Sequence, residues 1–198
     1  MTRIPAPERR HALIEAALRV VARDGIAQAT TRAIVAEAGM SLASFHYAFE
    51  SRDEMLDELI RTVVEREQSA LNPPMDPGVS LRDRIAHGLH LYFDHLRADP
   101  DHERVMLELT QYALRDPERR PLAVAQYARY RALAAGALER GIAGSGSRWR
   151  VPVEQVAQAL VAMTDGLTMT WLVDRDDAAA GRFIAAAADT IAGMAEDA

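Results

Sequence analysis

Apolar residues recur at spacings of three and four along nearly the whole chain, and no segment alternates between apolar and polar residues for the length of a strand. Spacings of three and four place side chains on one face of an α-helix, whereas strict alternation is typical of a half-buried β-strand. The sequence therefore predicts an all-α protein.

Proline, glycine and capping residues divide this pattern into about nine expected helices. They span residues 7–23, 31–38 and 41–47, a long helix from Ser51, then 80–98, 101–115, 118–140, 153–173 and 176–194. Ser51 and Glu54 have the spacing of a capping box. Residues 72–78 contain three prolines and a glycine, which predicts a linker. The Gly-Ser-Gly-Ser core of residues 141–150 predicts a flexible loop.

The composition narrows the function classes. The chain contains no cysteine, which excludes disulfides, thiolate metal sites and a cysteine nucleophile. No apolar run of signal-peptide length follows the first ten residues, so we expect a cytoplasmic protein with no membrane partner. The apolar stretch 156–173 is interrupted by Gln158 and Asp165, which favours a buried helix over a bilayer span.

The charge of the chain argues mildly against a nucleic-acid partner, because the formal net charge is −6 and such domains are usually basic. Residues 1–60 hold seven Arg against nine Asp and Glu, so this part is acidic as well. Any contact with DNA must therefore come from individually placed residues.

Two short expected helices follow a longer one and are joined by a tight turn at Gly39, which is the outline of a helix-turn-helix. From Thr30 the sequence reads TTRAIVAEAGMSLASFHYAFESRDEML. This segment resembles the TetR-family signature: two threonines, a short helix ending in Ala-Gly, a small residue and Ser, an aromatic pair, a Phe, and a Ser-Lys-Glu-like opening to the next helix. The resemblance includes individual residues over positions 8–60, and beyond them it is limited to the expected arrangement of helices.

The resemblance implies an N-terminal three-helix helix-turn-helix domain, residues 1–50, and a larger C-terminal helical domain for ligand binding and dimerisation, residues 51–198. The helix from Ser51 would connect the two. It further implies a ligand-responsive transcriptional regulator, a homodimer that we expect to be a repressor, released from a palindromic operator by a small organic molecule. Activation by ligand stays open. No cofactor is implied.

In the family, a helix corresponding to residues 41–47 enters the major groove of DNA, and the preceding helix spans the phosphates. The residues that the resemblance and the local charge assign to DNA are Arg3, Arg9, Arg10, Thr31, Arg32, Ser41, Leu42, Ser44, His46, Tyr47 and Arg52. Arg52 would hold a phosphate at the start of the fourth helix. Three positions depart from the family pattern, namely Val35, His46 and Ala48, so the base preference of relatives is not carried over.

Aromatic, Met and Thr residues in the C-terminal part suit either a ligand cavity or an ordinary core. The candidate pocket residues are Leu59, His87, Leu91, Tyr92, Met106, Thr110, Tyr127, Arg131, Met163, Thr164, Leu167 and Trp171. Their composition suggests a neutral or weakly charged organic ligand. Arg131 would meet either a ligand carboxylate or a neighbouring acid.

The last two expected helices are apolar and rich in small residues, which indicates a two-fold interface of four helices. The candidate interface residues are Val161, Asp165, Gly166, Thr168, Leu172, Ile184, Ala187, Ala188 and Ile191. A two-fold dimer reads a palindrome whose half-sites lie about 34 to 36 Å apart.

The sequence bears on three alternatives: a metal site, an enzyme and a binding protein without DNA recognition. A metal site is not expected, because His87 and His90 share a helix face but neither they nor His95 and His102 complete a ligand set. A di-iron enzyme needs two Glu-x-x-His pairs, and the chain has one, at residues 8–11, so no enzyme is expected. A helical binding protein that has lost DNA recognition is the stronger alternative, because residues 1–60 are so weakly basic.

Overall fold

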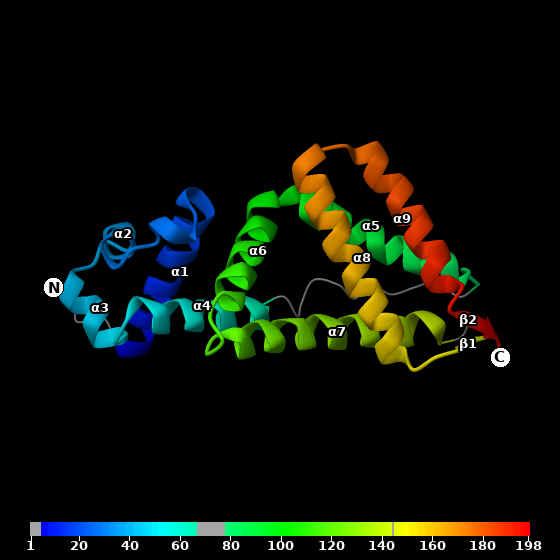
Figure 1. Cartoon of the computed structure of the whole chain (residues 1–198), viewed down its shortest axis with the longest axis horizontal. Helices are drawn as coiled ribbons and strands as arrows, with labels where there is room; N and C mark the ends of the chain where they lie inside the picture. Colours follow the sequence, from blue (N-terminus) through cyan, green and yellow to red (C-terminus); the bar gives the residue numbers. More distant parts are fainter. Residues whose placement is uncertain (1–4, 67–77, 144) are drawn as a thin grey trace. The chain divides into compact units, whose positions relative to one another are not determined.

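The computed structural model describes residues 5–66, 78–143 and 145–198, and these residues are almost entirely helical (Figure 1). The all-α prediction is confirmed. The elements are α1 (Ala6–Asp24), a short 3₁₀-helix η1 (Ile26–Gln28), α2 (Thr31–Glu37), α3 (Leu42–Ala48), α4 (Arg52–Arg66), α5 (Leu81–Ala98), α6 (Pro100–Leu114), α7 (Arg120–Ile142), β1 (Ser147–Trp149), α8 (Val153–Asp174), α9 (Asp177–Ala192) and β2 (Ala195–Asp197). The expected linker lies, apart from Gly78, outside the described residues.

Much of the described part of this stretch, residues 141–143 and 145–150, is regular structure, so the prediction of a flexible loop was wrong there. α7 continues through Ile142, and β1 pairs antiparallel with β2, with Arg148 opposite Glu196. The side chains of these two residues also form an ion pair of 2.7 Å. The pairing joins residues almost fifty positions apart, so the local Gly-Ser composition carries no sign of it.

The start of α4 is close to the expected capping box. The N–H of Glu54 donates to Ser51 Oγ at 3.0 Å. The Glu54 carboxylate accepts from the N–H of Glu50 at 2.7 Å, one residue before the position that a capping box uses. Both ends of the motif therefore satisfy backbone N–H groups at the entry to the helix.

The chain divides into two compact units, which are described separately. The first comprises residues 1–67 and 101–126, and thus α1 to α4, α6 and the start of α7. Its core contains Leu13, Ile34, Phe45, Leu56 and Leu109, each fully buried. The helix-turn-helix and α6 thus share one hydrophobic core.

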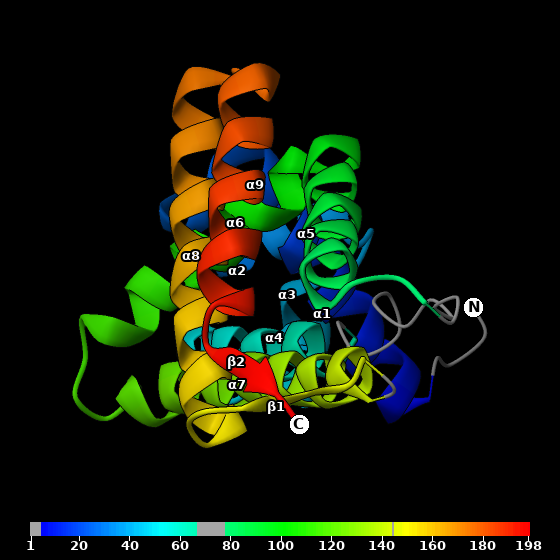
Figure 2. The same cartoon turned by 90° about the vertical axis from the view of Figure 1, so that its right-hand side faces the viewer.

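The second unit comprises residues 68–100 and 127–198. In it α9 packs against both α5 and α8 (Figure 2). The rings of Phe93 on α5 and Trp171 on α8 meet edge to face, with centroids 5.6 Å apart. Ile184 and Ile191 of α9 are fully buried beside them. The buried residues of this core are mostly aliphatic, with Phe93 and Trp171 as its aromatic members.

Among the described helices, α8 alone is long and apolar enough, by length and composition, to cross a membrane. Val156, Leu167 and Trp171 of α8 are buried in the core of the second unit, as in a core helix of a folded domain. The opposite face of α8 leaves Met169 and Val173 exposed, with Val173 exposed by 74%.

Candidate nucleic-acid interface and effector site

Local capping fixes the two short helices. The hydroxyl of Thr30 accepts from the N–H of Ala33, and that of Ser41 accepts from the N–H of Ser44, each at 3.2 Å. Between them Gly39 has a φ of +63°, the left-handed conformation that favours glycine. The chain can therefore turn sharply from α2 into α3.

One face of α3 is buried and the other is open. Phe45 is fully buried and meets Phe49 with ring centroids 5.6 Å apart. On the outer face Leu42 and His46 are exposed, and Tyr47 is 81% exposed. An exposed tyrosine does not gain the free energy of burying its ring in the core. Such exposure is typical of a tyrosine that contacts a partner.

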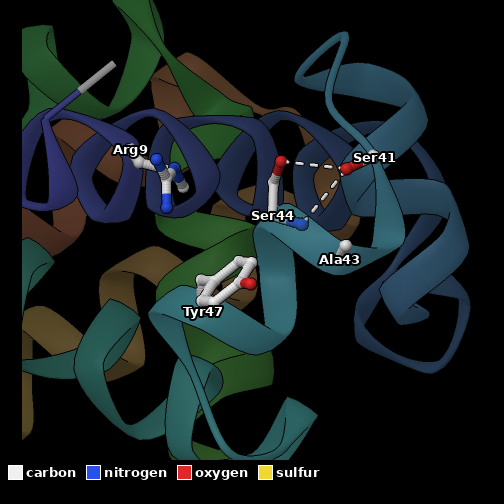
Figure 3. A pocket seen from close by; sticks show the side chains of 5 residues that line it. All are labelled: Arg9, Ser41, Ala43, Ser44 and Tyr47. Carbon is white, nitrogen blue, oxygen red and sulfur yellow. Dashed lines mark hydrogen bonds between the residues drawn. The ribbon is translucent and has the colours of Figure 1, made fainter. Parts of the chain in front are cut away.

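A shallow hollow of about 370 Å³ lies between α3 and the start of α1 (Figure 3). Arg9, Ser41, Ala43, Ser44 and Tyr47 line it. The hydroxyls of Ser41 and Ser44 are 3.0 Å apart, which fixes both at its rim. A guanidinium, two hydroxyls and a phenol can together bond to phosphate oxygens and base edges.

Two of the predicted DNA-contacting arginines form hydrogen bonds within the first unit. Arg52 donates from Nε to the carbonyl of Ala29 at 2.7 Å and from Nη2 to that of Ile26. Arg10 lies over the Phe49 ring, 4.2 Å from its centroid, and donates to the carbonyl of Ala48. Both guanidinium groups therefore satisfy carbonyls at the ends of short helices.

The other predicted DNA-contacting residues are placed differently. Arg32 is exposed and Thr31 is half-buried on α2. Arg3 lies outside the described residues. Of the predicted set, the structure brings together Arg9, Ser41, Ser44 and Tyr47 around one hollow.

Contacts between α6 and the helix-turn-helix were missed by the sequence reasoning. The Glu108 carboxylate accepts from the N–H of Ile26 at 2.8 Å, and Arg104 donates to the carbonyl of Ala22 at 2.7 Å. Partners 82 positions apart leave no local pattern in the sequence.

A charged cluster joins α4 to the segment around the start of α7. Arg119 forms ion pairs with Asp53, with Asp116 at 2.6 Å and, more distantly, with Asp57 at 3.7 Å. The Tyr112 hydroxyl donates to Asp53 at 2.9 Å. Burial, and then that bond to Asp53, raises the pKa of Tyr112 to about 12. The guanidinium of Arg119 is thus the shared counterion of three carboxylates.

The predicted pocket residues fall in both units. Leu59, Met106 and Thr110 are buried in the first, where the Thr110 hydroxyl bonds to the Met106 carbonyl and to Gln126. The remaining nine belong to the second unit: His87, Leu91, Tyr92, Tyr127, Arg131, Met163, Thr164, Leu167 and Trp171.

Within the second unit several of these residues bond to the protein itself. Tyr92 and Thr168 share a hydrogen bond between their hydroxyls, and the Trp171 indole donates to Asp177 at 2.8 Å. His87 is exposed. The Tyr127 ring meets the Tyr130 ring with centroids 5.6 Å apart. Burial, and then the nearby Asp165 charge, raises the pKa of Tyr127 to about 12.

Most of the predicted interface residues are buried within a single chain. This applies to Val161, Thr168, Ile184, Ala187, Ala188 and Ile191. Asp165, Gly166 and Leu172 are half-buried. The exposed large apolar side chains on these helices are Met169, Val173 and Phe183.

Two family profiles match the chain. Residues 13–59 match the profile described as bacterial regulatory proteins, tetR family, and residues 81–196 match that of the BetI-type transcriptional repressor, C-terminal. The chain is similar to the HTH-type nicotine-responsive transcriptional repressor HdnoR of Paenarthrobacter nicotinovorans, with 28% identity over 176 residues, 88% of this chain and 89% of that protein.

Two further likenesses extend along most of the chain. The HTH-type transcriptional regulator BetI of Rhizobium meliloti (strain 1021) is 29% identical over 161 residues, 81% of this chain and 76% of its own. Among solved structures, multidrug binding protein EbrR complexed with ethidium is 28% identical, with a TM-score of 0.69 and coverage of 92% of this chain and 98% of that one.

Proposed function

Because the chain belongs to the TetR family of bacterial transcriptional regulators, we propose that it reads a palindromic operator as a homodimer, with α3 of each copy in the major groove. It is a ligand-responsive DNA-binding regulator and not an enzyme. The observation that carries the proposal is the open face of α3, where an 81% exposed tyrosine borders the hollow at Arg9.

The proposed DNA contacts have two roles. Ser44, Tyr47 and His46 face the base edges, and Arg9 and Arg32 neutralise phosphates. The bonds of Arg52 and Arg10 to carbonyls support a positioning role, in which these residues hold the short helices in place. The DNA-binding part is proposed to be residues 1–50, with sensing and dimerisation in residues 51–198.

The proposed two-fold interface uses α8 and α9. Met169, Val173 and Phe183 are large apolar side chains that a single chain leaves exposed. A β-carbon added at Gly166 would meet no atom within 4 Å, so α8 offers an open surface there. Covering this face with a second copy removes apolar surface from water and gives the symmetry of a palindrome.

The proposed effector is a small organic molecule that binds in the second unit and releases DNA, so that the protein acts as a repressor in the cytoplasm. Support comes from the relatives, of which one is named nicotine-responsive and another was solved with ethidium. A ligand that binds one arrangement of the dimer more tightly shifts the population toward that arrangement.

Fluorescence anisotropy on DNA from upstream of the protein's own gene tests the DNA-binding proposal. Tyr47→Ala should weaken specific binding about tenfold or more, since one good base contact contributes about 1–3 kcal/mol. Arg32→Ala should weaken binding to all sequences and lower the salt slope by about one. Arg115→Ala is the matched control, because Arg115 is an exposed arginine of the same unit outside the proposed surface.

The outcomes separate the two classes of protein. Wild-type binding that Tyr47→Ala and Arg32→Ala leave unchanged, with both variants folded by circular dichroism, would overturn the assignment of the α3 face. Wild-type protein without any specific binding to the upstream DNA would favour the alternative, a helical binding protein that has lost DNA recognition.

A further inference from the structure

The open face of α3 carries apolar side chains beside its polar ones. Leu42, the first residue of the helix, is 44% exposed, and Ala43 is exposed as well. Ala43 and Tyr47 lie one turn apart on the side of α3 opposite the buried Phe45. Both also line the hollow between α3 and the start of α1 (Figure 3). The methyl groups of Leu42 and Ala43 are therefore part of the surface that α3 presents to a partner.

The same helix lacks the side chains that identify a base most sharply. Arginine and lysine recognise guanine by paired hydrogen bonds, asparagine and glutamine recognise adenine, and aspartate and glutamate accept a hydrogen bond from cytosine. None of these residue types occurs in residues 41–48, which read SLASFHYA. The polar groups on the open face are hydroxyls and an imidazole, and a hydroxyl can bond to donors and acceptors of any base pair. Discrimination between bases by α3 therefore depends largely on apolar contact.

Apolar contact in the major groove selects thymine. Thymine presents its C5 methyl group there, whereas the edges of the other three bases are polar. Burying that methyl against leucine and alanine side chains removes apolar surface from water on both sides of the contact. A polar base edge in the same place would lose its water without gaining a hydrogen bond, which costs free energy. Both effects favour thymine at the base that meets Leu42 and Ala43.

We propose that Leu42 and Ala43 recognise the C5 methyl of a thymine in each operator half-site and so determine the base preference at that position. The inference rests on the proposed function, in which α3 enters the major groove. Arg9 lines the same hollow as Ala43, so a phosphate of the DNA backbone that binds there positions α3 on the groove. The base identity itself comes from the methyl contact.

Deoxyuridine isolates this contact, because it differs from thymidine only by the missing C5 methyl and keeps every hydrogen-bonding group. Wild-type protein first selects its operator from a pool of random DNA duplexes. Each thymine of the selected site is then replaced in turn, together with its symmetry mate, and the affinity is measured by fluorescence anisotropy. At one position, wild type should bind at least about tenfold more weakly, because a lost methyl contact costs about fourfold and both half-sites lose one.

Two substitutions assign the contact to α3. Leu42→Ala should lower the ratio of thymine to deoxyuridine affinity at that position to about threefold or less, and adding Ala43→Ser should bring it close to unity. Leu114→Ala is the matched control, because Leu114 of α6 is a 52% exposed leucine of the same unit, and it should keep the wild-type ratio. Comparing ratios isolates the contact, because any effect of deoxyuridine on the shape of the duplex is the same for every variant.

The outcomes distinguish this inference from the regulator function. Specific wild-type binding that no deoxyuridine weakens would overturn the methyl contact and leave the regulator function standing. A selected half-site without thymine would do the same, as would a wild-type ratio that survives the double substitution or that Leu114→Ala also removes. Failure of folded wild-type protein to select any sequence would instead overturn the regulator function, and the inference with it.

Discussion

Some arginines of the first unit form hydrogen bonds within the protein and others are exposed to solvent, although the sequence predicts DNA contacts for both kinds. Arg52 donates hydrogen bonds to the carbonyl of Ile26, the first residue of η1, and to that of Ala29, which follows η1; its side chain is 29% exposed. Arg32 is exposed on α2, and the structure describes no hydrogen bond or ion pair for it. The first residue therefore contributes to the fold, and the second is available to a partner.

We therefore expect substitutions of Arg52 and Arg32 to differ in their effect on stability. Arg52→Ala should lower the free energy of unfolding by about 1–3 kcal/mol, because charge-assisted hydrogen bonds to two carbonyls are lost. Arg32→Ala should change it by less than about 0.5 kcal/mol. Urea unfolding measures both values. Arg52→Lys is a second variant that keeps the charge but not the paired donors, and it should lose most of the same stability. Equal effects of Arg52→Ala and Arg32→Ala would contradict the positioning role.

At the scale of the element, α4 carries two carboxylates whose surroundings act in opposite directions. The N–H of Glu50, and then the Arg10 guanidinium, lowers the pKa of Glu54. Burial raises the pKa of Asp57, although Arg119 and Arg61 act against it and Asp53 and Asp116 act with it. Ionised Glu54 is therefore favoured in the folded protein, and ionised Asp57 is disfavoured.

Neutral isosteres at these positions should change stability with opposite signs. A carboxyl whose pKa is higher in the folded than in the unfolded protein lowers the free energy of unfolding once the pH is high enough to ionise it. Asp57→Asn should therefore raise the free energy of unfolding at neutral pH, and this gain should vanish below about pH 3.9, where Asp57 is protonated in both states. A carboxyl whose pKa is lower in the folded than in the unfolded protein raises the free energy of unfolding when it is ionised. Glu54→Gln should therefore lower the free energy of unfolding at neutral pH, and this loss should shrink below about pH 4.3. Urea unfolding across a pH series measures both. Changes of the same sign would refute this assignment of causes.

Elements defined by local chemistry were predictable from the sequence, and those defined by distant partners were not. Thr30, Gly39 and Ser41 cap and turn within a few residues of one another, so α2 and α3 were placed to within one residue. The β1–β2 pairing and the bond from Ile26 to Glu108 depend on segments far apart in the chain. For the same reason composition could list candidate pocket residues but could not reveal that the Tyr92 hydroxyl bonds to that of Thr168, 76 positions further along the chain.

At the scale of the whole molecule, DNA recognition has to overcome an unfavourable overall charge. The formal net charge of −6 repels phosphates, so the DNA-binding part of a single copy gains little from counterion release. In the proposed homodimer, binding of the second DNA-binding part becomes intramolecular, which strengthens binding to a palindrome without changing the contacts that each copy makes. Dimerisation through α8 and α9 is therefore the condition on which the proposed function depends.

Gly166→Arg tests that condition. An arginine at this open position of α8 would project a long charged side chain into the proposed interface, so sedimentation should show monomers. Affinity for a palindromic operator should then fall about a hundredfold or more, while affinity for a single half-site changes little. Gly88→Arg is the matched control, because an added β-carbon at Gly88 of α5 also meets no atom within 4 Å, and this variant should remain a dimer. If Gly166→Arg stays dimeric with full operator affinity, the two-fold interface lies elsewhere on the chain, and the exposed side chains of Met169, Val173 and Phe183 need a different partner.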